Sequence, residues 1–95
     1  MDLAHARQID PSMTEAFLIL RDFGDRLTEV HLSEVNSACK HEAISHSAML
    51  AYRQVASLVP DSIFVILESV IAADFIDDEI DAACQSLADR PRPGI

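Results

Sequence analysis

Residues 63–73 read IFVILESVIAA, and Glu68 and Ser69 are the only polar positions among them. Pro60 breaks any helix that approaches from the N-terminal side, because proline disfavours helix in the residue before it, and Asp61 can cap a new helix. The β-branched residues favour a strand. However, the apolar run continues past the usual length of a strand, and a lone strand would have no partner. We therefore expect a helix here, the third of the chain.

A helix that is apolar on every side is difficult for a 95-residue monomer to cover. A two-fold dimer is the commonest solution for such a surplus of apolar surface. We therefore expect a homodimer, with six apolar side chains divided between the protein's own core and the partner subunit. They are Ile63, Phe64, Ile66, Leu67, Val70 and Ile71.

Helix signals also flank this segment at both ends of the chain. A first helix is expected at residues 11–23, with Asp10 as its cap and Gly24 as a left-handed stop. A fourth is expected from Asp74 to about residue 89, because carboxylates follow the cap and apolar residues recur at helical spacing. No Gly or Pro separates the third helix from the fourth, so whether the two are continuous stays open.

The central part of the chain predicts a long helix. Residues 25–58 contain neither Gly nor Pro, and their apolar positions form a broad arc at 100° per residue. This pattern indicates one helix or two in line, with Asn36 and Ser37 as the weak point. The fold expected from the sequence is therefore all-α: a compact three- or four-helix bundle, mostly antiparallel, with a long central helix. It forms a single domain over 1–95, with a loosely ordered start at 1–9 and a mobile tail at 90–95.

The charge balance excludes several classes of protein. Sixteen acidic residues stand against seven Lys and Arg, a formal net charge of −9, so we expect no direct binding to nucleic acid. No run approaches the roughly 20 apolar residues of a membrane span, and residues 1–7 lack the pattern of an export signal. We therefore expect a cytoplasmic protein without membrane contact, in which Cys39 and Cys84 are buried thiols.

Sequence motifs for metal binding or catalysis are weak. Cys39, Glu42 and His46 share a face at helical spacing, but no pair of ligands has the spacing of a known zinc motif. We therefore expect packed or exposed histidines and no metal or cofactor, although the sequence leaves metal binding by these three residues open. The chain also lacks a nucleophile elbow, a phosphate loop and a calcium loop, which predicts a protein that is not an enzyme.

The distribution of charge is the most informative feature. Residues 54–89 hold eight carboxylates and no Lys or Arg, whereas a solvated helix usually interleaves both signs. Surfaces of one sign attract partners of the other sign. The expected partner is a basic protein surface, such as that of a nucleic-acid-binding protein. The residues expected to contact it are Asp74, Asp77, Asp78, Glu79 and Asp81.

The leading hypothesis is a small acidic interaction protein that binds and regulates or inhibits a basic macromolecule. Phage- or plasmid-encoded inhibitors, among them anti-CRISPR proteins and nucleic-acid mimics, often have this size and acidity, which is an analogy and not a shared motif. A bacterial structural or assembly subunit that acts by oligomerisation is the alternative. A small metal-binding or enzymatic bundle is the third candidate.

Overall fold

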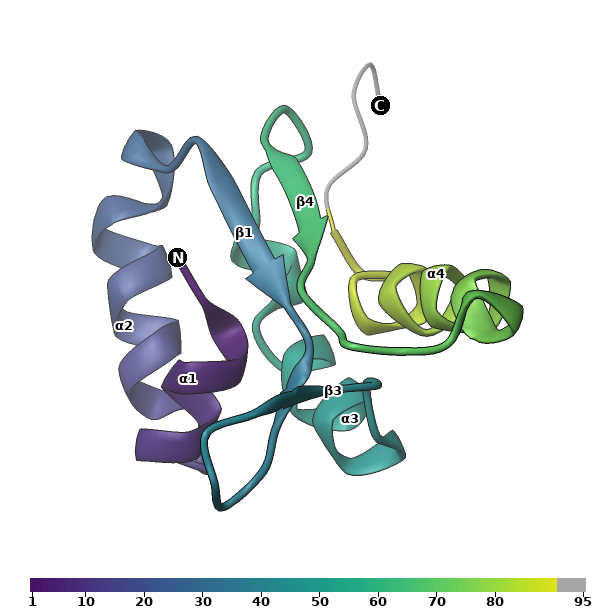
Figure 1. Ribbon diagram of the computed structural model, residues 1–95. Coiled ribbons are helices and arrows are strands. Elements are labelled where there is room, and N and C mark those ends of the chain that lie inside the picture. The colour runs from purple at the N-terminus through teal and green to yellow at the C-terminus, as the bar shows by residue number, and fades with distance from the viewer. Residues whose placement is uncertain (91–95) are drawn as a thin grey trace.

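Two parallel strands run through the centre of the molecule, so the all-α bundle expected from the sequence is wrong (Figure 1). The computed structural model describes residues 1–90 and is a mixed α+β fold. Its elements, with η for 3-10 helices, are α1 (Leu3–Ile9), α2 (Thr14–Phe23), η1 (Gly24–Arg26), β1 (Glu29–Leu32), β2 (Glu34–Val35), β3 (His41–Glu42), α3 (His46–Arg53), η2 (Ala56–Leu58), β4 (Phe64–Leu67), η3 (Ala73–Phe75) and α4 (Ile76–Ser86).

The segment expected to be the third helix forms β4. It pairs in parallel with β1, in a register that runs from Glu29 opposite Phe64 to Leu32 opposite Leu67. β-branched and aromatic side chains fit a pleated surface. The partner that a lone strand would lack is β1, which sequence analysis placed inside the central helix. Parallel strands require a crossover connection, and here this connection contains α3.

The expected long central helix is also absent, because residues 25–58 hold three short strands, a hairpin turn and α3. Along β1, Val30 and Leu32 are buried while Glu29 and His31 are half-buried, and this alternation is the period of a strand. At the expected weak point, the Asn36 side chain accepts the N–H groups of Ala38 and Lys40 at 2.9 and 3.1 Å. This local bonding makes the turn between β2 and β3, because asparagine competes with helical hydrogen bonds.

The start of the chain is held by specific contacts instead of being loosely ordered. The Asp2 side chain caps α1, and Leu3 is completely buried. Ahead of the helix, Asp2 forms a parallel bridge with His31 of β1, whose N–H donates to the Met1 carbonyl at 2.8 Å. Three extended segments therefore run in parallel, in the order chain start, β1, β4.

Several boundaries agree with the sequence and others differ in detail. The break at Val59-Pro60 is confirmed, and α2 and α4 occupy most of the residues expected for the first and fourth helices. Gly24 is right-handed, with φ of −58°, and so is not the left-handed stop that was expected. Of the expected tail, Arg90 donates to the carbonyl oxygens of Pro60 and Ile63, and residues 91–95 lie outside the described part.

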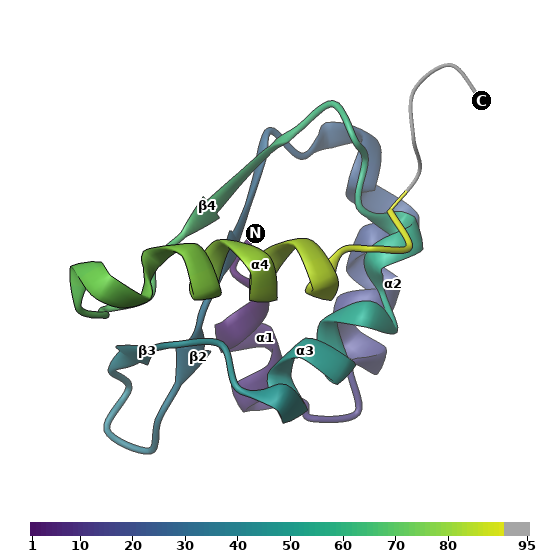
Figure 2. The same ribbon diagram turned by 90° about the vertical axis from the view of Figure 1, so that its right-hand side faces the viewer.

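The helices leave one face of the sheet uncovered. Val30 and Leu32 face a core built by α1, α2, α3 and the end of α4, and Val65 and Leu67 pack against it. Figure 2 shows α4 crossing the molecule on the opposite side from α2. The other face of the sheet carries the alternate residues of β1 and β4, which point away from this core. Within residues 1–90, no helix is both long and apolar enough to cross a membrane.

Candidate metal centre

The uncovered face of the sheet carries a cluster of histidines and carboxylates near the carboxyl ends of the parallel strands. Asp2, His31 and Glu68 come from the three parallel segments, with Glu68 directly after β4. The Glu68 N–H donates to the Leu32 carbonyl at 3.0 Å, which continues the ladder and fixes this residue beside β1. Ligands of α/β proteins gather at this end of parallel strands.

His31 lies between two carboxylates. Its Nε2 is 2.7 Å from Glu29 Oε1, and its Nδ1 is 2.5 Å from Glu68 Oε1. Hydrogen bonds that Glu29 and Glu68 accept, that of Glu29 first, raise the pKa of His31 above its ordinary value, against a smaller opposing effect of burial. The two carboxylates therefore favour the protonated form of His31.

His41 reaches the cluster from the β2–β3 hairpin. Its Nδ1 is 2.8 Å from the hydroxyl oxygen of Ser33, and its Nε2 faces Glu68 Oε2 at 3.9 Å. Ser33 is itself buried, and its carbonyl accepts the Tyr52 hydroxyl at 2.6 Å. Burial raises the pKa of Tyr52, so this donor keeps its proton. One ring nitrogen of His41 is therefore fixed by the fold and the other is turned toward the carboxylates.

Asp2 and His5 contribute from the first turn of α1. Asp2 Oδ1 accepts the backbone N–H of His5 at 3.0 Å, which is the helix cap, while Oδ2 lies 3.6 Å from His5 Nε2. The His5 ring meets the His41 ring edge-on, with 5.3 Å between centroids. The cap thus occupies one carboxylate oxygen and leaves the other beside the two histidines.

Two groups of potential ligands share Asp2. Within each group the ligand atoms all lie within 4.8 Å of one another: one group is Asp2, His5 and His41, the other Asp2, His31 and Glu68. The cluster includes three carboxylates, counting Glu29, beside its histidine rings. This surplus of negative charge in a half-buried place favours a cation.

The partners behind the ligands suit a metal ion. Metal-binding histidines usually donate their second ring N–H to a carboxylate or another fixed acceptor, which orients the ring. Glu29 is paired with Nε2 of His31, and Ser33 is paired with Nδ1 of His41. The second nitrogen of each ring faces Glu68, so an ion placed there would have both rings and this carboxylate as ligands. Three imidazoles and two carboxylates form a mixed nitrogen and oxygen set that fits divalent transition metals such as Zn²⁺.

The ligand set that the sequence suggested is different. Cys39 is exposed in the hairpin turn at a left-handed φ of 59°, and Glu42 and His46 are exposed at the end of β3 and the start of α3. Within residues 1–90, these three do not form a ligand group. The expectation that both cysteines are buried is wrong as well, since Cys84 is also an exposed thiol.

Sequence reasoning missed the observed cluster because its members are spread from residue 2 to residue 68. One local signal was present. Asp2 and His5 are three residues apart at a helix start, a spacing that places both side chains on one face.

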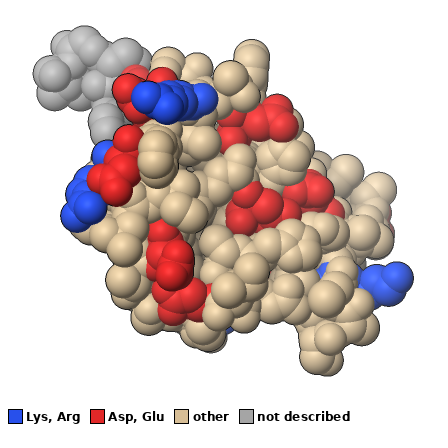
Figure 3. Space-filling model, turned by 90° about the vertical axis from the view of Figure 1, so that its left-hand side faces the viewer, with Lys and Arg blue, Asp and Glu red and all other residues tan. Residues whose placement is uncertain are grey.

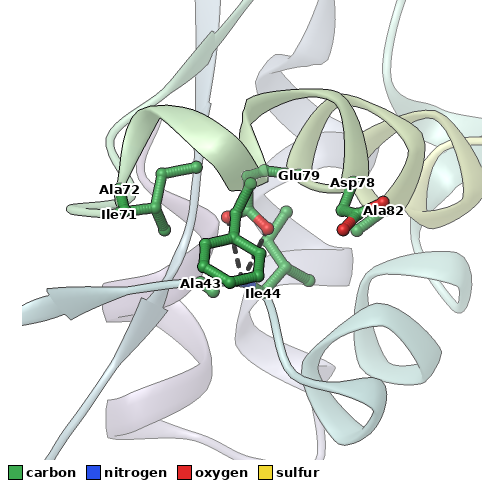
Figure 4. Close-up of a pocket in the computed structure, with 8 residues that line it drawn as sticks. Ala43, Ile44, Ile71, Ala72, Asp78, Glu79 and Ala82 are labelled. Atoms are coloured by element: carbon green, nitrogen blue, oxygen red, sulfur yellow. Dashed lines mark hydrogen bonds between the residues drawn. The ribbon is translucent and has the colours of Figure 1, made fainter.

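The acidic residues expected to bind a partner separate into two groups. Asp74, Asp77, Asp78 and Asp81 are exposed on η3 and α4, whereas Glu79 is buried. The Glu79 carboxylate accepts the N–H of Ile44 (Figure 4). It also accepts the hydroxyl of Ser69. Of the apolar residues expected to face inward from this helix, Ala83 and Leu87 do so. Ile76, Ile80 and Cys84 are exposed.

A groove lies beside the exposed acidic edge. It has a volume of about 460 Å³, is lined mainly by apolar side chains such as Ile44, Ile71 and Phe75, and has Asp78 on its rim. On the α1–α2 side of the molecule, carboxylates gather across the middle while Lys and Arg lie nearer the margins (Figure 3). Acidic surface therefore extends beyond α4.

The residues expected at a dimer interface lie on β4 and the segment after it. Phe64 and Val70 are 77% and 79% exposed, and Ile66 is 37% exposed. Ile63 and Leu67 instead pack against the core, because alternate residues of a strand face opposite sides. Ile71 is half-buried and lines the groove.

No family model, curated protein or solved structure matches this chain.

Proposed function

We propose that this protein binds a divalent transition metal ion through Asp2, His5, His31, His41 and Glu68. The observation that carries the proposal is the convergence of two ligand groups on one carboxylate, Asp2. An ion between His31 and Glu68 replaces their direct contact, and each residue then provides a ligand atom. The ion also neutralises the carboxylates, which a protonated His31 does only in part.

The centre resembles open metal sites more than closed structural ones. Structural zinc sites are usually closed tetrahedra, often rich in cysteine, whereas catalytic sites keep a position for water. Here the ligands are half-buried: 25% of the His41 side chain and 43% of the His5 side chain are exposed. A metal ion in such a place lowers the pKa of a bound water toward neutrality and polarises an oxygen of a substrate.

Calorimetric titration of the purified, metal-free protein with Zn²⁺ tests this proposal. We expect one tight site in the wild type and loss of that site in His31→Ala and in Glu68→Gln. His46→Ala is the matched control, because His46 is exposed on α3 outside the cluster. Equal binding by all four proteins would place the metal elsewhere, and no binding by the wild type would refute the proposal.

A second function, docking of a basic partner, is favoured by a separate observation. The exposed edge formed by Asp74, Asp77, Asp78 and Asp81 lies beside the apolar groove. A partner segment with an apolar anchor and flanking Lys or Arg would complement both features, and long-range attraction would speed its association. The protein would then bind and regulate or inhibit its partner, as expected from the sequence.

A synthetic amphipathic Lys/Leu peptide is a suitable probe for the acidic edge. Its affinity should fall with rising salt, and should fall by about 1–3 kcal/mol in the triple variant Asp77→Asn/Asp78→Asn/Asp81→Asn. The control variant Glu15→Gln/Asp22→Asn/Asp25→Asn changes the net charge equally on exposed residues outside α4. Equal losses in both triple variants would indicate attraction by net charge alone, and the assembly-subunit alternative would then lead.

The cytoplasm remains the proposed compartment. Both cysteines are exposed thiols, and thiols of this kind persist in reducing compartments.

A further inference from the structure

Glu79 is not part of the exposed acidic edge of α4 and instead makes hydrogen bonds inside the molecule. It is only 4% exposed although it lies in a helix whose other carboxylates are in solvent. Burial of a carboxylate is costly unless donors surround it. Here both oxygens accept the Ile44 N–H, at 3.1 and 2.9 Å, and Oε2 also accepts the Ser69 hydroxyl.

The two donors stand next to the ligands of the metal centre. Ser69 directly follows Glu68, and Ile44 is three residues beyond His41. Both donors lie in connecting segments outside regular elements, between β3 and α3 and between β4 and η3. One side chain of α4 therefore joins the two segments that directly follow His41 and Glu68, whose facing atoms are 3.9 Å apart.

We propose that Glu79 is a positioning residue for the metal centre, which sets the separation of His41 and Glu68 by holding Ile44 and Ser69 together. The inference rests on the proposed metal binding. The hydrogen bonds of Glu79 go to Ile44 and Ser69 and not to the two ligand side chains, so it acts through the backbone that carries them. Charge-assisted hydrogen bonds are short and directional, which suits this role.

A purely structural role for Glu79 makes a different prediction. In that case its loss lowers the stability of the α4 packing and leaves the metal site unchanged in the folded molecules. Leu87→Ala provides the comparison, because Leu87 is a buried residue just past the same helix and belongs to the core rather than to the loops. Leu87→Ala should lower the stability of the protein without changing the two loops, so it controls for effects that come from reduced stability alone.

The experiment measures Zn²⁺ affinity and the visible spectrum of the Co²⁺ form in the full chain. In Glu79→Ala we expect Zn²⁺ affinity to fall about tenfold or more, the size of losses seen when groups that orient ligands are removed. The Co²⁺ spectrum should change because the ligand geometry changes. Leu87→Ala should retain both properties. Glu79→Gln should restore most of the affinity, since an amide can accept from Ile44 and donate to Ser69.

Ser69→Ala removes a single hydroxyl and covers the case in which Glu79→Ala does not fold. It should weaken Zn²⁺ binding in the same direction and by a smaller factor. Wild-type affinity and spectrum in both Glu79→Ala and Ser69→Ala, with metal bound by the wild type, would overturn the positioning role alone. Failure of the wild type to bind Zn²⁺ would overturn the proposed function and the positioning role with it.

Discussion

The two faces of the β1–β4 sheet differ although the same two strands build them. On the core face, Val30 and Leu32 are fully buried among the helices. On the other face, His31 is held between two carboxylates and Phe64 is mostly exposed. Because successive side chains of a strand point to opposite sides, one short strand serves both faces.

The comparison separates what stabilises the fold from what gives it a site. Burial of apolar surface on the core face contributes to folding, whereas the other face gathers carboxylates and a histidine that stay partly exposed. Substitutions of neighbouring residues on β1 should therefore act on different properties: the free energy of unfolding on the core face, and metal affinity on the other face. The predictions below test this separation.

The largest effect on stability is expected from Leu32→Ala on the core face. Leu32 has no exposed surface, so its truncation leaves a cavity and should lower the free energy of unfolding by about 2–5 kcal/mol. Urea denaturation measures this change. A loss below about 1 kcal/mol would show that the core face is not packed as described.

The next largest effect is expected in metal affinity, from Asp2→Asn on the charged face. Asparagine caps a helix as well as aspartate does, so α1 should keep its start while both ligand groups lose their shared carboxylate. We expect Zn²⁺ affinity to fall about 100-fold, which corresponds to about 2.7 kcal/mol. Titration calorimetry measures the affinity, and circular dichroism should show unchanged helicity.

The fold was only partly predictable from the sequence. Local signals located α2, α4 and the break at Val59-Pro60, because caps, proline and helical periodicity act over a few residues. The strands were missed because β1 and β4 are short and stabilise each other across more than 30 residues of sequence. The sequence of each strand by itself resembles part of a helix, and only the pairing of the two strands favours the extended conformation.

The candidate site was less predictable than the fold. Its five ligands come from the chain start, α1, β1, β3 and the segment after β4, so their proximity depends on the parallel pairing that was missed. The negative charge of α4 was visible in the sequence, but the inward turn of Glu79 was not. That orientation depends on the positions of Ile44 and Ser69.

A smaller effect is expected from pH on the metal-free protein. The carboxylates raise the pKa of His31 in the folded state, so its contribution to stability is fully present below the ordinary histidine pKa of about 6.5. That contribution is lost as pH rises through the raised pKa. The difference in unfolding free energy between wild type and His31→Gln should therefore shrink as pH rises above about 6.5.

The smallest effect on stability is expected from Phe64→Ser, opposite Glu29 on the charged face. Because Phe64 is 77% exposed, the free energy of unfolding of the monomer should change by about 0.5 kcal/mol or less. Homodimerisation through this surface stays a prediction, and light scattering tests it. Wild type should give about twice the chain mass of 10.5 kDa and Phe64→Ser a lower value. A monomeric wild type would contradict the dimer.

Asp2 has two partners of different kinds, since one oxygen closes the first turn of α1 and the other faces His5. An ion that draws this carboxylate toward itself alters the hydrogen bond to the His5 amide. Exchange of that amide proton with deuterated solvent then depends on occupancy, although the amide is not a ligand. The exchange rate of this one amide at the start of α1 would then report how much of the protein has metal bound, without any added label.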